Sequence, residues 1–183
     1  MRTMEEAWGW YQETRRQLRL WERMVSRYWD DLPWEGKLGG DDRFRNLDET
    51  QLVDASKAAL GQIDDLAVLV LFSVFESMIR GRVAAGIRSQ MQEKAVDNAV
   101  IVLAVDEAVR KVEEGSFHWV LQSFKAVDHN LVEEVNQVRR YRNWVAHGRR
   151  GESPAAVEPA TAYDRLNRFW QLIGTGSTSP DVS

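Results

Sequence analysis

Mainly apolar residues recur near the start of the chain at alternating intervals of four and three, which is the spacing of one face of an α-helix. The face consists of Ala7, Tyr11, Thr14, Leu18, Trp21, Val25 and Tyr28. It predicts a helix from Met4 to Asp30 that packs along another helix. An alternative is that this face receives a partner protein. The following stretch, residues 31–47, is rich in Gly, Pro and Asp and predicts a loop.

The longest predicted helix runs from about Glu49 to about Gly86. Its centre, LAVLVLFSVF, is apolar nearly all round, which predicts a position in the middle of a helical bundle. Gly81 and Gly86 are expected to weaken its end, because glycine costs about 1 kcal/mol in a helix interior.

The rest of the chain predicts three more helices and one short amphipathic piece, SFHWVLQSF. The helices run from Ser89 to Glu113, from Asp128 or Asn130 to His147 with Gly148 as the stop, and from Thr161 to Ile173. Residues 174–183 predict a disordered tail. No stretch alternates apolar and polar residues in the manner of a strand. We therefore expect an all-α fold, an antiparallel bundle of four main helices with shorter additions, in one domain covering residues 1–173.

Composition narrows the possible functions. The chain of 183 residues has no cysteine, which excludes disulfides and thiolate metal sites. It has no dense His/Asp/Glu cluster and no phosphate-binding glycine loop, so neither a metal nor a cofactor is expected. The start has no signal-peptide core, and the longest apolar run, Leu66 to Phe72, is far shorter than the roughly 20 residues of a membrane span. These features predict a cytoplasmic protein with no membrane contact.

One arginine interrupts an apolar stripe near the end of the fourth long helix. The stripe consists of Leu131, Val135, Val138, Arg142 and Val145. Burial of an unpaired guanidinium would cost several kcal/mol, so Arg142 needs a partner or an open cleft. The alternative is a packed stem with a hydrated head.

Glu76 is the corresponding anomaly on the central helix, where it lies among Leu69, Phe72, Ile79 and Val83. A bidentate pair between Glu76 and Arg142 would satisfy both groups, and we favour it. The alternative is a local pair with Arg80, one turn further along the same face.

The segment from Arg139 to Arg150 is basic, although the whole chain has a formal net charge of −4. Arg139, Asn143 and His147 are spaced by four and share one strip of the helix. An unperturbed histidine has a pKa of about 6.5, so it can take up and release protons near neutral pH. Helix capping does not require all the arginines, which predicts a patch suited to phosphates that includes Arg149 and Arg150. Arg140 points away from the stripe and receives no role.

The segment from Arg142 to His147, RNWVAH, resembles the R-x4-6-H motif of the HEPN domain superfamily. Its position at the end of a late helix in an all-α chain, with a lone acid on the central helix, adds to the likeness. The resemblance implies a metal-independent endoribonuclease that acts as a dimer. Arg142 would hold the scissile phosphate or orient the site, His147 would act as general base or acid, and Asn143 would bind substrate or fix the histidine. Glu76 would support the site.

The resemblance also implies partners. RNA would be the substrate, bound by Arg139, Arg149 and Arg150, a second copy would complete the site, and an antitoxin protein would silence a toxin of this kind. The expected role is that of a toxin or an antiviral defence effector. The alternatives are a non-catalytic RNA-binding or protein-interaction module, and a pocket for a small phosphorylated ligand.

Overall fold

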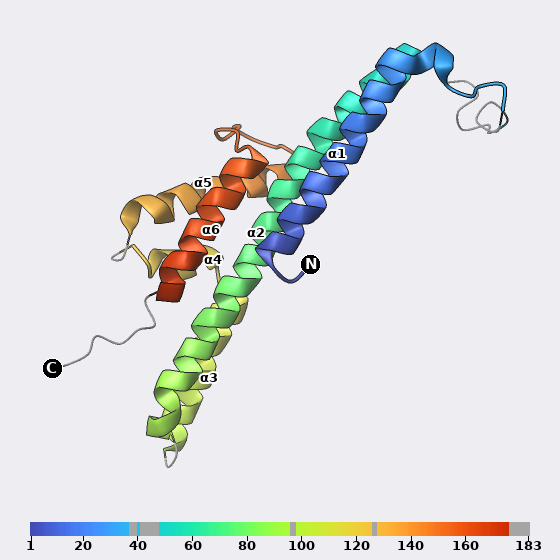
Figure 1. Ribbon diagram of the computed structural model, residues 1–183. Coiled ribbons are helices and arrows are strands. Elements are labelled where there is room, and N and C mark those ends of the chain that lie inside the picture. Colours follow the sequence, from blue (N-terminus) through green and yellow to red (C-terminus); the bar gives the residue numbers. More distant parts are fainter. Residues whose placement is uncertain (37–39, 41–47, 96–97, 126–127, 176–183) are drawn as a thin grey trace. The chain divides into compact units, whose positions relative to one another are not determined.

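The computed structural model describes residues 1–36, 40, 48–95, 98–125 and 128–175. Regular structure in these residues is helical throughout, with six α-helices, one short 3₁₀ helix (η1, Trp29–Asp31) and no strand (Figure 1). The α-helices are α1 (Met4–Tyr28), α2 (Glu49–Ala95), α3 (Ala99–Glu114), α4 (Phe117–Gln122), α5 (His129–Ala146) and α6 (Pro159–Thr175). The predicted all-α class is confirmed.

The chain forms two compact units. The hairpin unit is Trp8–Ala67, and the site unit is Met1–Ala7 together with Val68–Ser183. Most of the predicted loop at 31–47 and of the predicted tail at 174–183 lies outside the described residues. The boundaries of the predicted single domain, 1–173, stay a prediction.

The hairpin unit consists of α1 and the first part of α2, which lie side by side (Figure 1). Tyr11, Ile63 and Ala67 form its buried cluster. Asp64 of α2 accepts hydrogen bonds from the Tyr11 hydroxyl at 2.7 Å and from Arg15 Nε at 2.9 Å. Apolar packing and a half-buried ion pair therefore fix the same segment of the two helices.

The predicted apolar face of α1 is largely confirmed. Ala7, Tyr11 and Val25 are buried, and Thr14, Leu18 and Trp21 are half-buried. Tyr28, the last residue of the helix, is the exception, with 55% of its surface exposed. Since Tyr11 and Leu18 pack within the chain, this part of the face is not an open surface for a partner.

Helix α2 is longer than predicted. It continues through Gly81 and Gly86 to Ala95, so the predicted start of the third helix at Ser89 lies inside α2 and is wrong. Each glycine costs only about 1 kcal/mol, which burial of neighbours such as Ile79 and Ala84 offsets. Helix α3 instead starts after Asn98, whose side chain accepts a hydrogen bond from Val100 N at 3.0 Å.

Phenylalanines join the helices of the site unit. Phe75 of α2 meets Phe117 of α4 and Phe169 of α6 edge-on, with ring centroids 6.0 and 5.6 Å apart. Phe72 also meets Phe117 edge-on, at 5.7 Å. Such edge-to-face pairs stabilise a core beyond the area they bury. Helix α5 packs against α4 and α6, so this core supports the helix that carries the predicted site.

Helix α5 forms as its sequence predicts. The Asp128 side chain caps it by accepting a hydrogen bond from Leu131 N at 2.9 Å. Leu131, Val135 and Val138 of the predicted stripe are buried, while Arg142 is half-buried.

Part of α2 is strongly apolar over a long stretch. Among the described residues, the segment Glu49–Met91 could cross a membrane by length and composition alone. The core helix of a soluble protein meets the same criterion. The predicted cytoplasmic location therefore stays a prediction.

Replacement of Phe75 by Ala should lower the free energy of unfolding by about 3 to 5 kcal/mol, because it removes a fully buried ring from the centre of the site unit. Trp119→Ala is the matched control. That indole is 74% exposed, so its loss should cost less than about 0.5 kcal/mol. Chemical denaturation followed by circular dichroism measures both, and equal losses would contradict this description of the core.

Candidate functional site

The end of α5 is closed by a hydrogen-bonded turn. Gly148 N donates to Val145 O at 3.0 Å, and Arg149 N donates to Trp144 O at 2.8 Å. Gly148 has a φ of 72°, which glycine adopts without the clash that a side chain would cause. This pattern is a Schellman motif. It ends the helix at Ala146 and leaves His147 as the exposed C-cap.

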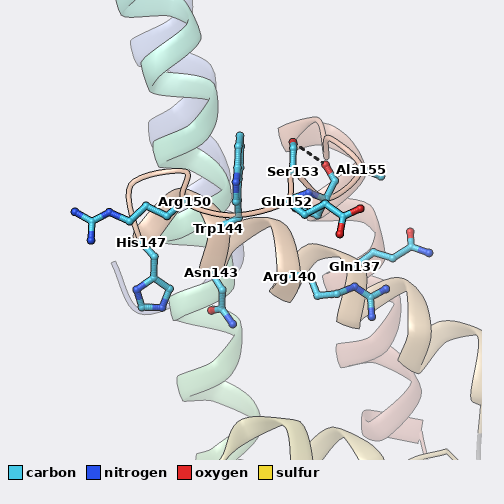
Figure 2. A pocket seen from close by; sticks show the side chains of 10 residues that line it. Gln137, Arg140, Asn143, Trp144, His147, Arg150, Glu152, Ser153 and Ala155 are labelled. Atoms are coloured by element: carbon cyan, nitrogen blue, oxygen red, sulfur yellow. Dashed lines mark hydrogen bonds between the residues drawn. The ribbon is translucent and has the colours of Figure 1, made fainter.

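The chain keeps turning after Gly148 and forms a groove beside α5. Arg149 and Gly151 also have positive φ values, 58° and 82°. The groove has a volume of about 740 Å³ (Figure 2). It is lined by Gln137, Arg140, Asn143, Trp144, His147, Arg150, Glu152, Ser153, Pro154 and Ala155.

Three of the predicted site residues line this groove together: Asn143, His147 and Arg150. Asn143 and His147 are one turn apart, and their side chains extend from the same side of α5 (Figure 2). They place a carboxamide and an imidazole next to a guanidinium. This combination can hold an anion and move a proton beside it.

Arg142 does not line the groove with His147. Its guanidinium carbon lies 5.6 Å from the centre of the Phe72 ring, and its Nη1 donates to Asn143 Oδ1 at 3.0 Å. Its Nε is buried without a hydrogen-bond partner among the described residues. Arg142 is therefore connected to the groove through the side chain of Asn143.

The favoured pair between Glu76 and Arg142 is not formed. Glu76 Oε1 instead accepts hydrogen bonds from Arg80, from Nε at 3.0 Å and from Nη2 at 2.6 Å, as the local alternative predicts. Arg80 also donates to the carbonyl oxygens of Val112 and Gly115 at the end of α3. A residue one turn away on the same helix meets Glu76 without any further ordering of the chain, so the local pair prevails.

The predicted RNA-binding arginines have different environments. Arg139 donates to Oδ1 of the buried Asn136 at 3.1 Å. Burial lowers the pKa of Arg139 from its ordinary value and Arg140 adds to this effect, while the carboxylates of Glu133 and Glu76 oppose it. Arg139 remains charged, because a guanidinium does not lose its proton in proteins. Of the three predicted arginines, Arg150 alone lines the groove.

Arg149 follows Gly148 directly and lies on Trp144. Its guanidinium carbon is 5.4 Å from the centre of the indole ring. A guanidinium over an aromatic face is attracted by the ring quadrupole. This contact holds Arg149 at the turn rather than in the groove.

Sequence reasoning missed several groove residues, Arg140 above all. Gln137, Arg140, Trp144 and His147 are spaced by three, four and three, so a second stripe on α5 could have revealed them. Arg140 also forms an ion pair with Glu133 on the same helix. Glu152 and Ser153 carry no such signal, because their place in the groove depends on the path of the turn.

The groove suits an anion more than a metal ion. Its lining includes two guanidinium groups, Arg140 and Arg150, and one carboxylate, Glu152. No group of three or more potential metal ligands occurs in the part of the chain that the structure describes.

No protein-family model matches the chain, and searches of curated proteins and of solved structures find no significant match. The resemblance to HEPN domains therefore stays an expectation from the sequence.

Gly148→Ala should lower the free energy of unfolding by about 1 to 2 kcal/mol, because a side chain at positive φ is strained. Gly81→Ala is the matched control. Neither position has a heavy atom within 4 Å of an added Cβ, but Gly81 lies inside α2. There alanine should stabilise by up to about 1 kcal/mol. Thermal unfolding of the two variants should give shifts of opposite sign, and a shared sign would contradict the assigned conformation of Gly148.

Proposed function

We propose that this protein is a metal-independent endoribonuclease of the HEPN type. The single observation that carries the proposal is the groove that gathers His147, Asn143, Arg140 and Arg150. Cleavage of RNA by its own 2′-hydroxyl needs a proton acceptor, a proton donor and positive charge at the phosphate. The groove offers the positive charge and one imidazole, which can take or give a proton.

In the proposed reaction, the His147 imidazole takes the proton of the ribose 2′-hydroxyl. The 2′-oxygen attacks the phosphorus, and the bond from phosphorus to the 5′-oxygen breaks. An imidazolium then gives its proton to the leaving 5′-oxygen. The products are a 2′,3′-cyclic phosphate and a 5′-hydroxyl end.

Arg140 and Arg150 bind the phosphate in this proposal, because they line the groove and their heads are exposed. Arg142 positions Asn143 instead. Its hydrogen bond occupies Asn143 Oδ1, so the amide nitrogen of Asn143 remains to donate to a phosphate oxygen. Glu76 does not line the groove. It pairs with Arg80, which binds carbonyl oxygens at the end of α3, so Glu76 supports the packing of the helices.

A dimer belongs to the same proposal. One histidine in each chain lines the groove, whereas the reaction needs a base and an acid at once. Two copies related by a twofold axis would supply two imidazoles. The proposed arrangement of each copy is the antiparallel bundle of four main helices, a form that the packing of α5 against α6 and the contact of Phe75 with Phe169 support.

The proposed biological role is that of a toxin or antiviral effector that cuts RNA in the cytoplasm, with an antitoxin protein as its inhibitor. A ribonuclease that cuts cellular RNA would damage its own cell unless a partner restrained it.

One observation favours a second candidate, a module that binds RNA without cutting it. Arg142, the arginine of the RNWVAH segment, does not line the groove with His147. If this arginine must touch the phosphate for catalysis, the groove would bind RNA and leave it intact.

His147→Ala should reduce cleavage of single-stranded RNA in EDTA by at least about 100-fold, because it removes the proton acceptor. His129→Ala is the matched control, an exposed histidine at the start of the same helix, and should cut like the wild type. Gel analysis of 2′,3′-cyclic phosphate ends measures the rate. A folded, dimeric wild-type protein that binds RNA but cuts none would favour the second candidate.

Arg142→Ala and Asn143→Ala should each lower kcat, and the double variant should be no slower than the slower single variant. This follows if Arg142 acts through Asn143, since coupled residues are not additive. Arg150→Ala is the comparison: it should mainly raise KM, and its effect should add to that of Asn143→Ala. Steady-state kinetics on one RNA give both values for each variant. Full additivity of Arg142→Ala and Asn143→Ala would refute the positioning role.

A further inference from the structure

The groove is larger than the proposed chemistry requires. Its volume of about 740 Å³ lies within the range of roughly 300 to 1,000 Å³ typical of small-molecule sites. The reacting phosphate and ribose need only the part next to His147, Asn143 and Arg150. Five of the lining residues follow His147, and the volume of the groove leaves room beside them for a neighbouring nucleobase.

Glu152 supplies a negative charge to the end of the groove that is formed by the residues after His147. It is the only carboxylate among the lining residues, and it forms no hydrogen bond or ion pair within the described part of the chain. Figure 2 shows its carboxylate directed toward the side of the groove where Arg140 and Gln137 lie. The turn with positive φ at Gly148, Arg149 and Gly151 precedes it and sets its position.

The amide oxygens in the groove are already engaged. Asn143 Oδ1 accepts from Arg142, and Gln137 Oε1 accepts from Arg165 at 3.0 Å. The Glu152 carboxylate is thus the charged side-chain acceptor available to a ligand at this end, next to the hydroxyl of Ser153. An ionised carboxylate accepts at both oxygens and donates at neither.

Among the four RNA bases, guanine matches such a group best. Its Watson–Crick edge presents two adjacent donors, N1–H and the 2-amino group, which can bind both carboxylate oxygens at once. Adenine and cytosine present one donor beside an acceptor, and the acceptor would face the second carboxylate oxygen. Uracil presents one donor between two acceptors. Bases in single-stranded RNA are commonly recognised on this edge.

Trp144 adds an apolar surface to the same region. Its half-buried indole lines the groove, and the guanidinium of Arg149 lies over its ring. Aromatic side chains are common stacking surfaces for unpaired bases. The groove therefore combines a stacking surface, a double acceptor and two cations.

We propose that this end of the groove is a guanine subsite, in which the Glu152 carboxylate accepts hydrogen bonds from N1–H and the 2-amino group of a guanine next to the scissile phosphate. The inference rests on the proposed ribonuclease function for its effect on cleavage. Base binding at Glu152 does not require that the bond be cut.

The test uses the full chain and short single-stranded RNAs of uridines that contain one guanosine, adenosine, cytidine or inosine. Binding is measured by fluorescence anisotropy and cleavage by gel, both in EDTA. The wild type should prefer guanosine over adenosine, cytidine and uridine by at least about tenfold, as for other bidentate base contacts. Inosine, which lacks the 2-amino group, should be intermediate.

Glu152→Gln should reduce the preference for guanosine over uridine to about one, because an amide cannot accept at both positions. Glu114→Gln is the matched control, an exposed glutamate at the end of α3, and should keep the wild-type preference. Equal binding of all the RNAs by the wild type would overturn the subsite, and so would a preference that survives in Glu152→Gln.

The two proposals fail in different ways. Binding that depends on guanosine and on Glu152, without any cleavage, would sustain the subsite and reject the ribonuclease. Cleavage that is the same next to every base would sustain the ribonuclease and reject the subsite.

Discussion

The left-handed backbone turn after α5 is the constraint on which the candidate site depends. The backbone N–H groups of Gly148 and Arg149 donate hydrogen bonds to carbonyl oxygens in the last turn of α5. The helix therefore ends before His147 and leaves this residue exposed. The positive φ values of Arg149 and Gly151 then complete the reversal that brings residues 152–155 beside α5. Without this reversal, His147 would lie at the open end of a helix and no groove would exist.

The arginines near this turn differ in how far their side chains are exposed to solvent. Arg142 packs on Phe72 and bonds to Asn143, and Arg139 bonds to the buried Asn136, so both guanidinium groups are committed within the chain. Arg140 and Arg150 are exposed and line the groove. Arg140 also pairs with Glu133, but water screens this exposed ion pair, so an incoming phosphate can compete for its guanidinium. A guanidinium packed inside the chain must first lose contacts that water does not screen. In the basic segment, Arg139 and Arg142 therefore stabilise the fold, whereas Arg140 and Arg150 are available to bind a ligand.

The fold was predictable where local chemistry decides it. The cap at Asp128, the stop at Gly148 and the buried stripe of Leu131, Val135 and Val138 all follow from intervals of a few residues, and the structure has each of them. The length of α2 was not predictable in this way. The cost of a glycine in a helix is small, so packing around Gly81 and Gly86 outweighs it and the helix continues.

The sequence by itself determined the helical class, the position of α5, and the presence of Asn143 and His147 on one strip of that helix. Helical periodicity repeats within four residues, so the sequence carries it directly. Only the tertiary structure decided that Glu76 pairs with Arg80, that Arg142 packs on Phe72, and that Arg140 and Glu152 border the groove. The sequence allowed Glu76 to pair either with Arg80 or with Arg142, and only the packing of the helices decided between them. The place of Glu152 depends on the path of the turn after α5, which no repeating interval of residues predicts.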